Sequence, residues 1–309
     1  MIAFGCSIIT PEVYERCARV GVELAAESDS AILAHAASGS IARSYNLLLD
    51  TAAAFDDLEA LVILHEDAEI VDPDFCTKLR YAFADPAVAV VGCVGATGVR
   101  GIAWWDGAVT GNSAPYHYSE LGGGELLWSP SGSEPVRPAG QVETVYGVML
   151  ALSPWAVGTL RFDESIGMLH GYDFDICRQA RAAGRMVITA DLGLAHHHSL
   201  DLVKDIEIWV AAHMRAAEKW DATAPDDSTQ DTWKHRARRA EADAAAARLL
   251  AASKLLQVDA TARYHGQQLA EILDSRSWRI TQPLRRARLG AKTARKRLAR
   301  SEPRSTTLS

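Results

Sequence analysis

One segment sets the architecture that this sequence predicts: Leu61-Val62-Ile63-Leu64-His65-Glu66-Asp67-Ala68-Glu69-Ile70. Four apolar residues run directly into a histidine, and three carboxylates accompany it. An uninterrupted apolar run is typical of a strand buried on both faces, and open α/β sheets bind their ligands at the carboxyl ends of such strands. An ordinary strand followed by a solvated acidic turn has the same pattern, so the rest of the chain must separate the two interpretations.

Length and composition indicate about two domains, or one large α/β domain with an appendage. Of the 309 residues 48% are hydrophobic, which suffices for a sizeable core, yet no apolar run approaches the roughly 20 residues of a membrane-spanning helix. The segment Met1–Cys6 lacks the basic flank of a signal peptide and is predicted to be the first strand. The five cysteines are scattered without CxxC spacing, which argues against a disulfide framework or a zinc site and favours the cytoplasm.

The charge is distributed unevenly. Residues 276–309 hold eleven of the 32 basic residues and one of the 39 acidic ones, so residues 1–275 carry a net charge of −17 (21 basic against 38 acidic). We expect this basic tail to contact an anionic membrane surface or a partner enzyme, at the inner face of the cell membrane. A solvated, disordered tail fits the composition equally well. Nucleic acid is not expected, because no recognised binding motif accompanies the charge.

Strand and helix patterns alternate through the first 220 residues. Apolar runs predict strands at 3–8, 31–34, 61–64, 88–93, 144–152 and 186–189, and helical patterns lie between them at 10–24, 41–55, 72–83, 153 onward, 173–183 and 201–220. Such alternation predicts an α/β fold, with a layered, mostly parallel sheet and helices on both faces. A Pro-, Asp- and Ser-rich linker follows at 222–231, and 232–273 is predicted to be a long helix. We therefore expect a domain at 1–220, a linker and helical appendage at 221–275, and a basic tail at 276–309; the appendage is a candidate dimer contact.

Residues 95–140 form a loop region rich in glycine and aromatic residues, including Trp104, Trp105 and Trp128. Long loops inside a compact domain are usually lids or binding loops. Flat aromatic rings suit the apolar faces of sugars, although they equally fit ordinary packing within the loop.

Three polar clusters fall at the ends of predicted strands or the starts of predicted helices: His65 to Asp67, Asp173 with Asp175, and His196 to His198. Carboxylates together with imidazoles suit a divalent cation, and a cation with open positions suits a diphosphate. No Gly-x-x-x-x-Gly-Lys loop is present, so we expect phosphate to be held by a metal ion rather than by a glycine-rich cradle.

Five motifs occur in order along the chain: Ser-Ile-Ala-Arg-Ser-Tyr-Asn (40–46), a strand into His-Glu-Asp (65–67), Val-Tyr-Gly (145–147) with Phe-Asp-Glu (162–164), Tyr-Asp-Phe-Asp-Ile-Cys-Arg (172–178), and a strand into His-His-His-Ser (196–199). Together they resemble the motifs of a family-two glycosyltransferase of the GT-A fold. The resemblance is closest to a bacterial branch with a His-x-Asp strand end, and it covers roughly residues 1–205. Ser277–Arg285 resembles a tail found on bacterial surface-polysaccharide glycosyltransferases.

This resemblance implies an inverting, metal-dependent transfer of a hexosyl or deoxyhexosyl group. The donor would be a nucleotide sugar, the cofactor Mg²⁺ or Mn²⁺, and the acceptor a glycan or lipid-linked glycan of the cell surface or a secreted polymer. Asp67 takes the position of the acid that reaches the metal and the diphosphate. His65 replaces the first acid of the family motif and is expected to contact the nucleotide, and Glu69 takes over from Asp67 if the register shifts by two.

Asp173 matches the general base of the family, although a helix N-cap is the structural alternative. Asp175 is expected to be a first-turn acid favoured by the helix dipole. His196 matches a further metal ligand, with His198 as the alternative in a shifted register.

Ser7, Arg43 and Asn46 match nucleotide contacts, and helix capping is the alternative for the last two. Tyr146 stands where the family often has an acid, which indicates an altered donor-sugar contact. This substitution and His65 leave one further function open, a catalytically degenerate GT-A fold that binds a nucleotide sugar or acts as a scaffold. A nucleotidyltransferase is disfavoured, because no glycine-rich basic loop follows the first strand.

Overall fold

A computed structural model describes residues 1–111, 116–119, 121, 123–126, 140–201, 203, 205–220, 230–285 and 287. The chain divides into two compact units, Met1–Gln257 and Val258–Ser309. Trp128 and most of the basic tail lie outside the described residues. The domain boundaries expected at 220 and 275 stay a prediction.

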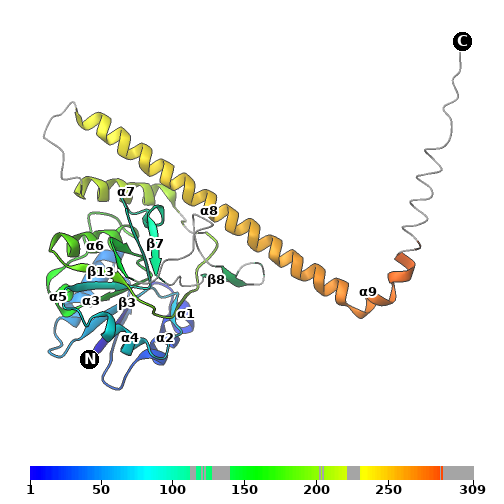
Figure 1. The fold of residues 1–309 in the computed structure, drawn as a ribbon, viewed down its shortest axis with the longest axis horizontal. Coiled ribbons are helices and arrows are strands. Elements are labelled where there is room, and N and C mark those ends of the chain that lie inside the picture. The colour runs from blue at the N-terminus through cyan, green and yellow to red at the C-terminus, as the bar shows by residue number, and fades with distance from the viewer. Residues whose placement is uncertain are drawn as a thin grey trace, which may run out of the picture. The chain divides into compact units, whose positions relative to one another are not determined.

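A seven-stranded sheet lies at the centre of the first unit (Figure 1). Five of its strands run in one direction, and β10 and β12 run the opposite way. The mixed, mostly parallel sheet expected from the sequence is thus confirmed. The order of the strands is β10 (Gln141–Val142), β13 (Met186–Thr189), β5 (Val88–Gly92), β12 (Met149–Leu152), β3 (Ala60–Leu64), β1 (Ile2–Ile8) and β2 (Ala31–Ala36).

Helices cover both faces of this sheet. Successive residues of β3 point to opposite sides, so its apolar side chains contribute to a core on each face. Leu61 and Ile63 pack in a core with side chains of α3 (Ile41–Ala52), α5 (Pro154–Thr159) and α6 (Tyr172–Ala182). Val62 and Leu64 belong to a second core with side chains of α2 (Ala18–Ala25), α4 (Phe75–Ala82) and α7 (Ile206–Trp220). All five residues of β3 are buried, as the apolar run predicts.

Two smaller sheets extend from the strand ends. One contains β11 (Thr144–Val145), β6 (Val94–Thr97) and β7 (Ala108–Gly111), and a 3₁₀ helix, η1 (Trp104–Asp106), precedes β7. The other contains β4 (Ala68–Ile70), β14 (Leu194–His196), β8 (Tyr116–Tyr118) and β9 (Gly124–Leu126). Strand β4 pairs antiparallel with β14, and Ala68 lies opposite His196. This pairing places the end of the segment at 61–70 beside the histidine cluster.

Two predicted elements are interrupted by tertiary contacts. The helix expected over 10–24 is two helices, α1 (Pro11–Arg16) and α2, separated at Cys17. Helix α2 lies so close to β4 that a Cβ atom on Gly21 would come within 2.2 Å of the Ile70 nitrogen. The strand expected over 144–152 is β11 and β12, separated by a turn at Gly147, where a Cβ atom would lie 2.4 Å from the Tyr172 hydroxyl. The helix expected from Asp201 begins at Ile206.

The C-terminal part is helical, as predicted. Helix α8 spans Gln230–Asp274 and α9 spans Arg276–Ile280. The N-terminal half of α8 lies beside α7 (Figure 1), where Leu249 is buried in the same core as Trp209. None of the helices in the described residues is long and apolar enough to cross a membrane.

Candidate active site

The site is built at the turn that joins β3 to β4. The His65 N–H donates to the carbonyl of Val148, the residue just before β12, and the His197 N–H donates to the Asp67 carbonyl at 2.8 Å. These backbone bonds tie the turn to β12 on one side and to the end of β14 on the other. Two segments separated by 129 residues in sequence therefore present Asp67 and His196 to each other.

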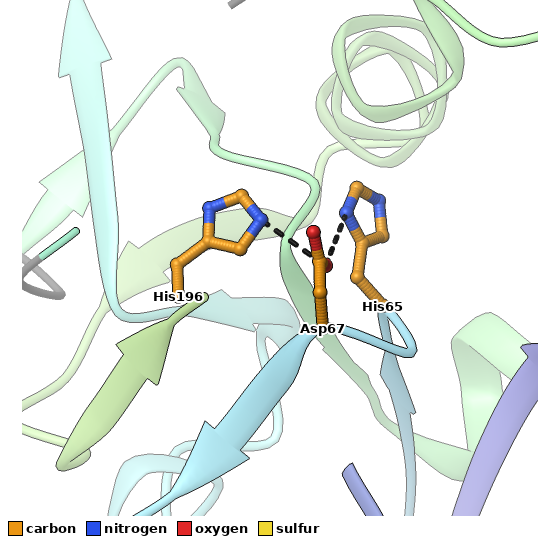
Figure 2. Close-up of side chains that lie close together, drawn as sticks. All are labelled: His65, Asp67 and His196. Carbon is orange, nitrogen blue, oxygen red and sulfur yellow. Dashed lines mark hydrogen bonds and ion pairs between the residues drawn. The ribbon is translucent and has the colours of Figure 1, made fainter. Parts of the chain in front are cut away.

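Three side chains converge at this turn (Figure 2). The Asp67 Oδ1 atom lies 3.2 Å from His196 Nε2 and 3.9 Å from His65 Nδ1. One ligand atom from each residue lies within 4.8 Å of the other two. Burial by itself raises the pKa of Asp67, but the His196 and His65 imidazoles outweigh it and hold that pKa below its usual range. An ionised carboxylate between two imidazoles is a donor set that fits a divalent cation.

His65 belongs to this group, whereas the sequence assigned it to the nucleotide. Burial lowers the pKa of His65 to about 4, so the imidazole is neutral at pH 7, as a metal ligand must be. Its Nε2 atom lies 2.6 Å from the Tyr172 hydroxyl. The sequence did contain a signal for placing His65 at the metal site, namely a histidine two residues before an aspartate at the end of a strand.

The two alternative ligands occupy other positions. Among the described residues, the group suited to an ion contains His196 but neither His198 nor Glu69. His198 lies beside His196, with ring centroids 5.0 Å apart. The Glu69 Oε2 atom pairs with His197 Nε2 at 2.6 Å. Glu69 pairs with His197 rather than with His196, so it is not part of the group around Asp67.

Asp173 lies in the first turn of α6. The N-cap of this helix is Gly171, whose φ of 84° suits glycine, so Asp173 is not the N-cap. Its Oδ2 atom accepts a hydrogen bond from the Gly147 N–H at 3.0 Å, and its Oδ1 atom accepts one from the Phe174 N–H at 2.9 Å. Burial raises the pKa of Asp173 to about 6. Such a carboxyl group is poised to accept a proton near neutral pH.

Asp175, in contrast, is fully buried and holds α6 to α7. Its carboxylate accepts from Lys219 Nζ and Trp220 Nε1, both at 2.8 Å, and from Gln179 Nε2 at 2.6 Å. We expect Asp175→Asn to lower the free energy of unfolding by about 2–3 kcal/mol, because it removes the charge from charge-assisted bonds in a buried position. Urea denaturation measures this loss. Unchanged stability together with lost turnover would instead place Asp175 in the chemistry.

A cleft of about 320 Å³ connects these groups. His65, Asp67 and His196 line it, and so do His198, Asp173 and Ser7 at the end of β1. His170, which the sequence did not single out, also lines it, and burial lowers its pKa to about 4. The apolar part of the lining includes Ile102, Trp104, Trp105, Val203, Trp209 and Leu249.

Two expected nucleotide contacts do not line the cleft. Asn46 donates through Nδ2 to the Phe162 carbonyl and accepts at Oδ1 from the Phe162 N–H, both at 2.9 Å. Arg43 is exposed on the first turn of α3, where its N–H donates to the Ser40 side chain. Tyr146 lies in the cleft with its hydroxyl 3.3 Å from His196 Nδ1 and its ring 5.1 Å from that of Trp104.

Comparisons with known proteins agree with the order of motifs. A family model described as "Glycosyltransferase like family" matches residues 3–228. Over 202 residues the chain is 27% identical to the streptomycin biosynthesis protein StrF of Streptomyces griseus, covering 64% of this chain and 67% of that protein.

The chain is also similar to two solved structures. The mannosyltransferase PcManGT from Pyrobaculum calidifontis, solved with GDP-Man and Mn²⁺, is 15% identical with a TM-score of 0.44, covering 97% of this chain and 87% of that one. GalNAc-T7, solved with UDP, GalNAc and Mn²⁺, is 9% identical with a TM-score of 0.42, covering 77% and 54%.

Proposed function

Because the chain belongs to the glycosyltransferase-like family, we propose that it moves a sugar from a nucleotide-sugar donor to an acceptor hydroxyl, with inversion and with a bound divalent cation. The family match over residues 3–228 confirms the resemblance to family-two glycosyltransferases. The metal, the inversion, the hexosyl or deoxyhexosyl donor and the surface or secreted glycan product are the proposal.

The observation that carries this proposal is the presence of a metal-type donor set and a raised-pKa carboxylate in one cleft. Asp173 takes the proton of the acceptor hydroxyl as its oxygen attacks the anomeric carbon. Each Asp173 oxygen already accepts one backbone N–H, which fixes the carboxylate and leaves a further lone pair for the hydroxyl. His65, Asp67 and His196 hold the cation. When bound, the cation supplies Lewis-acid neutralisation of the departing diphosphate.

The acceptor is proposed to bind against the tryptophans of the cleft. Trp104 and Trp105 come from the loop region at 95–140, and Trp209 of α7 lies 5.8 Å from Trp105 between ring centroids. Aromatic faces present flat apolar surfaces that match the C–H faces of a glycan or lipid-linked glycan.

The basic tail is proposed to contact an anionic membrane surface. Among its described residues, Arg285 lies over the ring of Trp278, and Ile280 and Leu284 are exposed. Exposed apolar side chains next to arginines suit the interface of an anionic bilayer. Deletion of residues 276–309 should abolish retention on anionic liposomes.

The transfer reaction is tested with the purified protein, Mn²⁺ and a panel of UDP-, GDP- and dTDP-sugars. We expect one donor class to release its nucleoside diphosphate, and Asp173→Asn to slow that release. A protein that bound a nucleotide sugar but behaved identically after Asp173→Asn would be the degenerate binding module. If no donor is bound or hydrolysed and Asp67→Ala changes nothing, the enzyme proposal fails.

The rate is expected to depend on the ionisation of Asp173. A general base must be deprotonated to act, and the pKa of Asp173 is raised by burial to about 6. We therefore expect kcat/KM to fall about tenfold per pH unit below pH 6 and to level off about one unit above it. Initial rates between pH 5 and 8 at saturating Mn²⁺ measure this profile. A value of kcat/KM that stays constant down to pH 5, as for an ordinary aspartate with a pKa of about 3.9, would exclude the buried carboxyl group as the base.

A further inference from the structure

We propose that Tyr172 is a positioning residue for the metal site, because its buried hydroxyl holds His65 in the tautomer whose Nδ1 lone pair faces Asp67. This inference rests on the proposed function only in its use of a divalent cation. It assigns a task to the first residue of the motif at 172–178, to which the resemblance gave no role, and it explains how a histidine serves where the family has an acid.

The hydroxyl of Tyr172 has one proton and more than one neighbour. It lies 3.1 Å from the Gly147 carbonyl and 2.6 Å from His65 Nε2. A carbonyl oxygen can only accept, so the Tyr172 proton goes to Gly147. With the Tyr172 proton directed at Gly147, the 2.6 Å contact is a hydrogen bond only if His65 Nε2 carries the hydrogen and donates it to the Tyr172 oxygen.

A neutral imidazole has one N–H, so a hydrogen on Nε2 leaves a lone pair on Nδ1. This Nδ1 atom lies 3.9 Å from Asp67 Oδ1, which is too long for a hydrogen bond. At this distance both atoms can bind one ion, since Mg²⁺ takes its ligands at about 2.0–2.1 Å. The opposite tautomer would direct an N–H at the ion and repel it.

The backbone at Gly147 makes this arrangement possible. A Cβ atom there would lie 2.4 Å from the Tyr172 hydroxyl, so any other residue would displace the tyrosine from the carbonyl. The Gly147 N–H donates to Asp173 Oδ2 at the same time. One glycine thus orients both the proposed base and, through Tyr172, the proposed ligand His65. Tyr172 is only 6% exposed, and its ring packs edge-on against Tyr45 with centroids 5.4 Å apart.

The test is Tyr172→Phe, which removes the hydroxyl and keeps the ring. Long-range ¹H–¹⁵N NMR on the metal-free protein at pH 7.5 reports the tautomer of His65. We expect Nε2–H alone in the unmodified protein and a mixture in the variant. Calorimetric titration with Mn²⁺, without donor or acceptor, should show a dissociation constant raised about 10–100-fold, as for the loss of other outer-shell partners of metal histidines.

The same substitution in a His65→Asp variant separates this effect from a general loss of stability. A carboxylate has no tautomers, so in this variant Tyr172→Phe should alter Mn²⁺ affinity less than about twofold. Equal losses in both backgrounds, or an Nδ1–H in the unmodified protein, would overturn the proposal. Because neither readout involves a sugar, absence of transfer with every donor would refute the proposed reaction and leave this result standing.

Discussion

Asp173→Asn is expected to lower kcat by about 10²–10⁴-fold, the contribution of a positioned general base. The amide keeps the size of the side chain and one acceptor oxygen, but it has no basic atom to take the hydroxyl proton. It also gives up one of the two backbone bonds, from Gly147 or from Phe174, at a cost of about 1 kcal/mol. Turnover of the best donor measures the loss of the base, and the melting temperature measures the loss of the backbone bond. Mn²⁺ affinity measures separately whether the metal site is affected.

Asp175→Asn is the matched control for this experiment, because it is the same change two residues further along the same helix. Asp175 binds Lys219 and Trp220 of α7 and does not line the cleft. The two variants should therefore give opposite results, with turnover lost at Asp173 and stability lost at Asp175. If Asp173→Asn keeps turnover within tenfold of the unmodified protein, another group is the base.

The strands and their polar ends follow from local sequence. The apolar run into His65 predicts a buried strand, and a buried strand must end at an edge of the sheet. Since strands that run in one direction end at the same edge, the predicted strands at 61–64 and 186–189 bring their carboxyl ends together. The antiparallel pairing of β14 with β4, which places His196 beside Asp67, was not predicted. The long helix from residue 230 is equally local, because its Ala- and Arg-rich composition favours helix throughout.

Contacts between distant segments could not be predicted in this way. The bond between His65 and Tyr172 joins residues 107 positions apart and depends on the turn at Gly147. Asn46 resembles a nucleotide contact by motif, yet both ends of its amide bind the backbone of Phe162, 116 residues away. The break at Cys17 has a similar origin, because the packing of α2 on β4 overrides a continuous apolar pattern. In each case a contact with a distant segment of the chain, rather than the local sequence, determines the local structure or the hydrogen bonds.

Asp67→Asn is expected to weaken Mn²⁺ binding by at least about 100-fold, more than the loss of an outer-shell partner. Asp67 is the only carboxylate in the described group, so its replacement leaves two neutral imidazoles and a neutral amide to face a doubly charged ion. Turnover should fall by about 10³-fold, since Lewis-acid stabilisation is worth several kcal/mol. Calorimetry with Mn²⁺ and the rate of diphosphate release measure the two effects.

Glu69→Gln is the matched control, because Glu69 lies on the adjoining strand and also pairs with a histidine of the same cluster. If the register is the one described, Glu69→Gln breaks a partly exposed pair with His197 and leaves Mn²⁺ affinity within about twofold, since exposed ion pairs contribute little. If Glu69→Gln abolished Mn²⁺ binding and Asp67→Asn did not, the ion would bind two residues further along the chain. The observed contacts argue against that result, because Glu69 pairs with His197, whereas Asp67 lies against His196 of the group suited to an ion.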